Sequence, residues 1–143
     1  MYLLDTNVVS ELRKVRSGRA NTSNTHVVAW ASAVNAASLY VSAISLLELE
    51  LGILQRERRD PAQGAPLRAW MTSQVLPAFS GRVLAVDQAV AVQCAQLHVP
   101  DRCAERDALI AATALVHGMT VVTRNVADFR STGVALLNPW DER

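Results

Sequence analysis

The chain has 143 residues, of which half are hydrophobic, and its formal net charge is +1. This length suffices for one domain that buries roughly two-thirds of its unfolded surface, so we expect a single domain over residues 1–143. No apolar stretch reaches the roughly 18 residues of a membrane span. A charge near zero does not by itself indicate a nucleic-acid-binding protein.

The N-terminal segment MYLLDTNVVSELRK has no basic leader before its apolar part and no small-residue cleavage site. It therefore predicts the first strand of a mature cytoplasmic protein instead of a signal peptide. The two cysteines, Cys94 and Cys103, argue against a disulfide scaffold, and neither has a second Cys or a His at zinc-like spacing. We therefore expect two reduced thiols and no zinc site.

Apolar runs of strand length alternate with helical patterns along the whole chain. Gly and Pro mark a loop insertion between helices near residues 59–66. Strands separated by helices predict an α/β fold with a parallel sheet covered on both faces. The expected strands lie at residues 2–4, within 39–45, and at 82–86, 119–123 and 134–137. The expected helices lie at about 27–37, 45–58, 67–79, 88–98 and 104–117, with Asp87 as an N-cap and Gly118 as a C-cap.

Acidic residues follow two of the expected strands. Asp5 stands at the carboxyl end of the first strand, and Thr123-Arg124-Asn125 followed by Asp128 stands at the carboxyl end of the fourth. Ligands of parallel sheets bind outside these ends. Asp107 opens an apolar helix and shares the face of the buried-type residues at i+3, i+4 and i+7, so it is predicted to point inward.

The stretch ISLLELELG carries two further acids, Glu48 and Glu50, within an apolar run. Residues that are two positions apart on a helix are rotated by about 200° about its axis, so the two carboxylates point in different directions. Both helix stripes contain apolar residues, and periodicity does not choose between them. Gly52 beside Glu48 permits close approach of another backbone, while Glu57 indicates water on the other stripe. These two features favour Glu48 as the inward carboxylate.

Each acid taken alone also fits an ordinary structural role. Asp5 fits a strand-end turn, Glu48 a salt-bridged helix residue, Asp107 a first-turn acid and Asp128 a helix cap. Together, the residues around them resemble a known family, the PIN-domain ribonucleases, and within it the VapC toxins of the FitB-like branch. The resemblance spans positions 2 to 140, and it rests on MYLLDTNVVSEL, ISLLELELG, RDALIAATALVHGMTVVTRNVADF and LLNPW.

The resemblance implies a three-layer α/β/α PIN domain with a parallel sheet of about five strands in the order 3-2-1-4-5. It further implies a Mg²⁺- or Mn²⁺-dependent endoribonuclease that leaves 5′-phosphate and 3′-hydroxyl ends. The family's acids, which are catalytic and metal-binding, fall on Asp5, Glu48, Asp107 and Asp128. Hard oxygen ligands without His or Cys suit these ions. Many relatives carry an acid near Asn125, and its absence here weakens a second metal position.

The same resemblance suggests supporting residues near the acids. Asn7 matches a polar position near the metal, and Ser45 matches the hydroxyl residue three positions before the family's helix glutamate. Thr6 is expected to bond within its turn or to orient Asp128. Thr123 and Arg124 flank the mouth of the site, where Arg124 equally fits a phosphate clamp and a solvated turn.

Two other groups of residues are assigned mainly structural roles. Arg102 and Arg106 could face RNA but are expected to pair with Asp101 or Glu105. The three tryptophans, Trp30, Trp70 and Trp140, are expected to pack within the fold.

The implied partners are RNA, a second copy of the chain and a VapB- or FitA-like antitoxin. The antitoxin's C-terminal segment would occupy the acidic groove of a heterotetramer or larger assembly and would alone contact operator DNA. The apolar helix faces around 44–54 and 67–79 are the candidate partner surfaces. Two alternatives remain: a catalytically weak PIN-fold module that binds RNA or protein, and a phosphatase of the haloacid-dehalogenase type. The phosphatase needs a second Asp where Asn7 stands and a lysine for which Lys14 is the only candidate.

Overall fold

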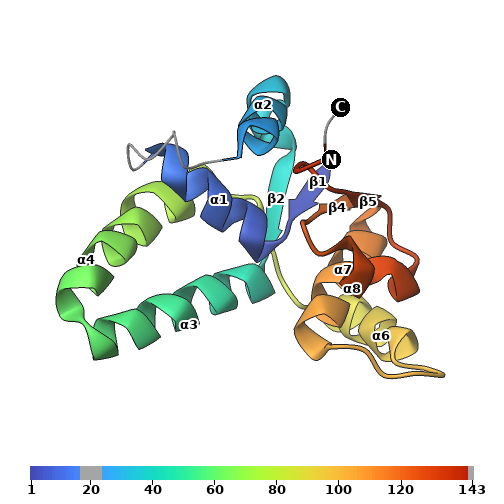
Figure 1. Ribbon diagram of the computed structural model, residues 1–143. Helices are drawn as coiled ribbons and strands as arrows, with labels where there is room; N and C mark the ends of the chain where they lie inside the picture. Colours follow the sequence, from blue (N-terminus) through green and yellow to red (C-terminus); the bar gives the residue numbers. More distant parts are fainter. Residues whose placement is uncertain (17–23, 142–143) are drawn as a thin grey trace.

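The computed structural model of the protein describes residues 1–16 and 24–141. A parallel sheet forms the middle layer, with the α1–α5 helices on one side and α6–α8 on the other (Figure 1). The five strands are β1 (Tyr2–Leu4), β2 (Leu39–Ser42), β3 (Val83–Leu84), β4 (Thr120–Val122) and β5 (Leu136–Leu137). Their order is β3-β2-β1-β4-β5, and every neighbouring pair is parallel, as predicted.

Successive residues of each central strand face opposite layers, as the two-residue period of a strand requires. Leu4 and Val122 join one core cluster with helix residues such as Val8 and Ile53. Leu3 and Val121 enter a second cluster on the other face, with Ile110 and Phe129 among its members. The strand β1 is therefore covered on both faces, which places the residue after it at the centre of the molecule.

The longer helices are amphipathic segments that cover these faces. They are α1 (Thr6–Arg16), α2 (Thr25–Ala33), α3 (Ala43–Arg59), α4 (Pro61–Trp70), α6 (Gln88–Leu97) and α7 (Glu105–His117). Shorter helical turns are η2 (Ala36–Ser38), η3 (Met71–Val75), α5 (Leu76–Ala78), α8 (Val126–Phe129) and η4 (Arg130–Thr132). The predicted caps are confirmed: the Asp87 side chain accepts from the Val90 amide, and Gly118 ends α7 with a left-handed φ of 66°. None of the helices in the described part of the chain has the length and apolar character needed to cross a membrane.

The prediction of a loop at residues 59–66 is wrong, because α4 already begins at Pro61. The Asp60 side chain accepts hydrogen bonds from the amides of Ala62 and Gln63, and Pro61 occupies a first-turn position where its missing N–H costs nothing. Gly64 allows close packing of α4 on α3, since a Cβ there would lie 2.6 Å from Glu57 Cγ. The two helices form the hairpin at the lower left of Figure 1.

Other boundaries differ by less. The helix expected at 27–37 ends at Ala33 and is followed by a separate turn, η2, which Asn35 caps. The third and fifth strands are shorter than the apolar runs that predicted them. The two sheet edges thus carry the shortest strands.

Candidate functional site

Asp5 connects the central strand to the first helix. Its amide donates to the Val122 carbonyl over 2.9 Å, which continues the sheet, and its carbonyl accepts the amides of Val8 and Val9 at the start of α1. The residue is only 6% exposed. The carboxylate therefore stands at the carboxyl edge of the sheet, as predicted, in a position fixed by the backbone on both sides.

Three donors hold the Asp5 carboxylate. The Thr123 hydroxyl, at the end of β4, donates to Oδ2 over 2.8 Å, and the Thr6 amide donates to Oδ1 over 2.8 Å. The Asn7 side-chain amide lies 3.4 Å from both Oδ2 and the Thr123 hydroxyl. The predicted supporting residues Thr123 and Asn7 thus contact Asp5 directly.

Glu48 is the inward acid of the pair in α3. The Thr6 hydroxyl donates to its Oε1 over 2.8 Å, and Arg106 of α7 reaches its Oε2 at 3.8 Å. Two expectations are corrected here. Thr6 does bond within its turn, through its amide to Asp5, but its hydroxyl orients Glu48 and not Asp128. Arg106 pairs with Glu48 and not with its neighbours in the chain, because the fold brings α3 and α7 together.

Glu50 has a basic partner instead. Arg68 of α4 lies 2.7 Å from Glu50 and 3.0 Å from Glu57, so these residues form a network between α3 and α4. The choice of Glu48 holds, but one reason for it was wrong. Among the described residues, nothing apart from the adjoining backbone of α3 lies within 4 Å of the position of a Cβ at Gly52, so no other backbone approaches this exposed glycine.

Asp107 and Asp128 complete the acidic group. Asp107 lies in the first turn of α7 and is partly buried, and Ile110, Ala111 and Ala114 on its face are fully buried, as predicted. Asp128 lies in α8 and is exposed. Figure 1 shows the start of α3, the start of α7 and α8 around the end of β1.

Charge links these four acids to one another. Burial raises the pKa of Asp5, hydrogen bonds from Thr123 and Thr6 lower it, and the charges of Glu48 and Asp128 raise it again. Burial, followed by the charges of Asp5, Asp128 and Glu48, raises the pKa of Asp107 to about 6. The structure therefore brings together acids from four separate elements, and their mutual repulsion favours a cation among them.

The chemistry of this donor set fits Mg²⁺ or Mn²⁺, because every charged ligand is a carboxylate oxygen. The side chains are not drawn together into a ready-made cage: over residues 1–16 and 24–141, no three His, Cys, Asp or Glu side chains are arranged to hold an ion directly. Mg²⁺ keeps several of its waters and needs few direct protein ligands. An ion held partly through water therefore needs no closed cage of side chains at these acids.

The remaining predicted residues have distinct surroundings. Arg124 is exposed, lies over the Trp140 ring at 5.4 Å, and its amide donates to Asn7 Oδ1 over 3.4 Å. The Ser45 hydroxyl is buried and has no hydrogen-bond partner within the described part of the chain. Trp140 packs on the first core cluster, as do the other two tryptophans, which confirms their packing role.

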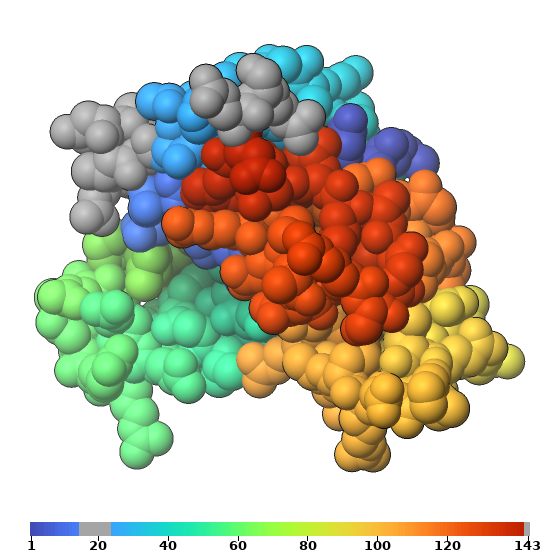
Figure 2. All heavy atoms as spheres, turned by 45° about the vertical axis from the view of Figure 1, so that its right-hand side comes forward, coloured from blue at the N-terminus to red at the C-terminus, as the bar shows by residue number. Residues whose placement is uncertain are grey.

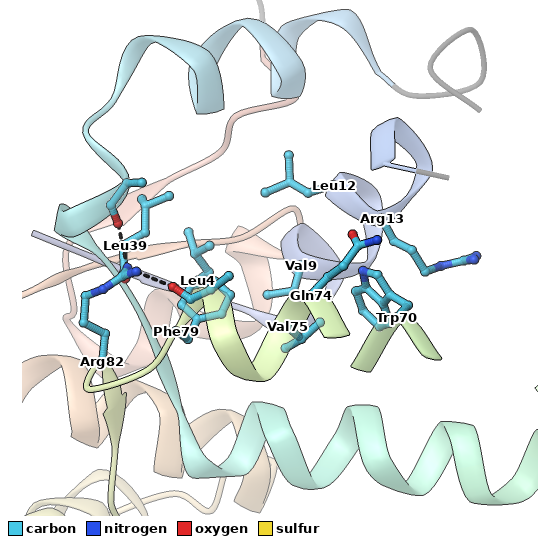
Figure 3. Close-up of a pocket in the computed structure, with 12 residues that line it drawn as sticks. Leu4, Val9, Leu12, Arg13, Leu39, Trp70, Gln74, Val75, Phe79 and Arg82 are labelled. Carbon is cyan, nitrogen blue, oxygen red and sulfur yellow. Dashed lines mark hydrogen bonds between the residues drawn. The ribbon is translucent and has the colours of Figure 1, made fainter. Parts of the chain in front are cut away.

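An apolar pocket of about 130 Å³ lies apart from the acids, between α1, β2 and the η3–α5 segment (Figure 3). Trp70, Val75 and Phe79 line it, and none of the predicted site residues does. The Gln74 side-chain oxygen at this pocket is buried without a partner. Most of the apolar face predicted over 67–79 thus packs inward around this pocket, with Met71 and Val75 buried.

Helix α3 leaves part of its apolar surface in solvent. Leu47, Leu51 and Leu54 are 48%, 37% and 51% exposed. Their spacing of four and three residues places them on one stripe of the helix. Figure 2 shows the green residues of the α3–α4 hairpin and the yellow residues of α6 projecting on opposite sides of the molecule.

Comparison with known proteins agrees with this arrangement. The family model of the PIN domain matches residues 2–134. A VapC ribonuclease, Y4jK, from Sinorhizobium fredii is 36% identical, with 99% of each chain covered. The toxin FitB from Neisseria gonorrhoeae is 35% identical over 99% of this chain and all of its own.

Solved structures extend the similarity to three dimensions. The crystal structure of FitAcB from Neisseria gonorrhoeae matches 99% of this chain and 100% of its own chain, with a TM-score of 0.87 at 35% identity. The structure of FitAB bound to an IR36 DNA fragment matches all of this chain and 98% of its own, with a TM-score of 0.83 at 35% identity. The chain belongs to the PIN domain family.

Proposed function

We propose that this PIN-domain chain is the toxin of a toxin–antitoxin pair and a Mg²⁺- or Mn²⁺-dependent endoribonuclease that hydrolyses phosphodiester bonds. The proposal rests on four acids, Asp5, Glu48, Asp107 and Asp128, which come from separate segments of the chain. Burial and then the charges of the other acids raise the pKa of Asp107, and burial and the charges of Glu48 and Asp128 raise the pKa of Asp5. The named ribonuclease and toxin relatives, similar over their full lengths, support the substrate class.

The chain's own residues would prepare the site in two ways. Thr123, the Thr6 amide and Asn7 fix both oxygens of Asp5, while the Thr6 hydroxyl fixes Glu48. These contacts keep two acids oriented and separate before a ligand arrives. Asp5, Glu48, Asp107 and Asp128 would hold the ion, in part through water.

A bound divalent ion would favour deprotonation of an attacking water and stabilise the charge that develops on the phosphoryl oxygens. Asp107, whose pKa is about 6 without a cation, must release its proton before it can serve as an anionic ligand. Arg106 places a positive charge beside Glu48, at a distance of 3.8 Å. Arg124, exposed beside Asn7, is placed to meet a phosphate of the RNA backbone.

The partner proposed for the chain is an antitoxin related to FitA or VapB, which would cover the acids and carry any contact with operator DNA. Support comes from the similar structures, which are described as FitAcB and as FitAB bound to a DNA fragment. The exposed leucines of α3 fit a surface that a partner chain or a second copy covers, since contiguous apolar residues in solvent mark interaction sites.

The test compares two glutamates of the same helix. Glu48→Gln removes a charge from the acidic group, whereas Glu50→Gln removes a charge that pairs with Arg68 outside it. We expect RNA cleavage to fall by at least ~10²-fold in Glu48→Gln and to remain near wild type in Glu50→Gln. Asp5→Asn should abolish cleavage while leaving circular dichroism unchanged, and a chelator should abolish wild-type cleavage.

Equal cleavage by the wild-type and Asp5→Asn proteins would exclude the assigned site. Full cleavage in the presence of chelator would exclude the metal, and Mn²⁺ titration by calorimetry of wild type and Asp107→Asn measures binding independently of turnover. Mn²⁺ binding without RNA cleavage would favour the binding-module alternative.

A further inference from the structure

A second cluster of reactive side chains lies away from the acids, where α6 ends and the chain turns toward α7. Cys94 and His98 are one helical turn apart, and Cys103 returns to the same imidazole five residues later. The sequence spacing gave no sign of this group, because the turn at residues 98–104 brings Cys103 back. It takes no part in the proposed reaction.

The imidazole of His98 contacts both thiols. The Cys103 amide donates to Nδ1 over 3.2 Å, so the neutral ring carries its proton on Nε2, which faces Cys94 Sγ at 3.8 Å. Cys103 Sγ lies 3.7 Å from Nδ1 and 3.6 Å from the Leu97 carbonyl. Both sulfurs are thus held against one ring.

The two thiols differ in their access to solvent. Cys94 is 6% exposed and packs with Val90, Ala108 and Ala112, whereas Cys103 is partly exposed beside the exposed residues Asp101 and Arg102. The residues that line one surface hollow include both cysteines, His98 and Arg102. An oxidant dissolved in water therefore reaches the Cys103 thiol first, and the buried Cys94 thiol is the second one at this site.

From this geometry we infer that Cys94 and Cys103 form a modification site, an intramolecular disulfide made in two steps by a peroxide. The Cys103 thiolate attacks the peroxide O–O bond, is oxidised to a sulfenic acid, and one oxygen leaves as water after taking a proton. The sulfur of Cys94 then attacks the sulfenic sulfur, and the second oxygen leaves as water with the Cys94 proton. Two thiols and hydrogen peroxide thus give one disulfide and two waters.

The disulfide would join the buried face of α6 to the residue just before the N-cap of α7. Asp107 lies four residues after Cys103, and Arg106, which pairs with Glu48, lies three residues after it. To form the bond, both sulfurs must leave their contacts with His98 and move toward each other. The disulfide would therefore restrain the N-terminal end of α7, the helix that carries Asp107.

The test uses the full chain, reduced, dilute and then treated with hydrogen peroxide. The chain has only two cysteines, so an intramolecular disulfide appears as a monomer that loses about 2 Da and regains it with a thiol reductant. Trypsin cleaves after Arg102 and separates the two thiols, so the oxidised protein must give one joined peptide of residues 83–102 and 103–106. Cys94→Ala should instead stop at a sulfenic acid on Cys103, which a cyclic diketone traps.

Cys103→Ala provides the matched control and should consume peroxide at Cys94 at least ~10-fold more slowly, because buried thiols are less reactive. The peptide map of the wild-type protein remains a valid test even if one of the variants fails to fold. Oxidation of wild type only to a sulfinic acid on Cys103, or only to a dimer on a non-reducing gel, would overturn the inference.

Discussion

The Thr6 hydroxyl donates to Glu48 Oε1 over 2.8 Å, although 42 positions separate the two residues. Thr6 is also the residue after Asp5, whose Oδ1 its amide contacts. One threonine therefore orients two acids, through its backbone for one and its side chain for the other. A single change at this position can test the orientation of Glu48 alone.

We expect Thr6→Val to reduce RNA cleavage by about 10- to 100-fold, as loss of a residue that orients a metal ligand commonly does. Valine keeps the shape and the backbone amide but lacks the hydroxyl, so Asp5 retains its contact. Thr6→Ser keeps the hydroxyl and should stay within a few-fold of wild type. Equal rates for valine and serine would show that the hydrogen bond to Glu48 has no functional effect.

Thr123→Val should shift the acid limb of the pH–rate profile to higher pH. The Thr123 hydroxyl is one of two donors that lower the pKa of the buried Asp5, so its removal raises that pKa further and keeps Asp5 protonated at a higher pH. The measurement is cleavage against pH at saturating Mn²⁺, with Thr123→Ser as the control. An unchanged limb would mean that Asp5 does not limit the reaction in acid.

Asp107→Asn should stabilise the protein in a metal-free buffer at pH 7.5. The pKa of Asp107 rises from 3.8 to about 6 in the folded state, so the native protein binds this proton more tightly than the unfolded chain. The resulting stabilisation is complete below pH 3.8 and is lost as the pH rises through about 6. Above that range the wild type contains a carboxylate that burial disfavours and the neighbouring acids repel, and the variant does not.

The expected gain is about 1 kcal/mol in the free energy of unfolding, discounted because the side chain is partly exposed to solvent. Denaturant unfolding in chelator measures it, with Asp101→Asn as a control in the exposed preceding loop. The gain should shrink below pH 4, where both states are protonated. A variant less stable than wild type at pH 7.5 would contradict the raised pKa of Asp107.

Two glycines of the α3–α4 hairpin should respond to alanine with opposite signs. Gly52→Ala should stabilise the protein by about 1 kcal/mol, since nothing lies near its Cβ position and alanine favours a helix interior. Gly64→Ala should destabilise it by about 1–3 kcal/mol, because the new Cβ would lie 2.7 Å from Glu57 Cα, which is backbone and cannot rotate away. Thermal unfolding of both variants gives the comparison, and a shared sign would refute the close packing at Gly64.

The predictable parts of the fold were those governed by local patterns. The alternation of apolar runs and helical periodicity located every strand and the parallel sheet, and Asp87 and Gly118 marked helix ends by their own chemistry. The strand order and the set of acids came from resemblance to a family, because no local pattern records which strands are neighbours. The segment 59–66 was misread because Asp60 and Pro61 start a helix as readily as they interrupt one.

The contacts between distant segments could not be predicted from spacing. Thr6 with Glu48, Arg106 with Glu48, and His98 with Cys103 each depend on how helices meet or how a turn closes. For Glu48, the correct choice rested partly on Gly52, whose surroundings turned out to be solvent. Tertiary packing determines these pairs, and it results from many weak interactions along the whole sequence that no local pattern records.

Asp5 serves the architecture with its main chain and the proposed chemistry with its side chain, and these two duties can be separated. Its amide and carbonyl bridge the sheet and α1 whatever the side chain carries, so asparagine at this position should preserve the shape of the molecule. The Asp5→Asn variant should therefore bind RNA without cleaving it. Crosslinking of the bound RNA to this variant would identify the target sequence.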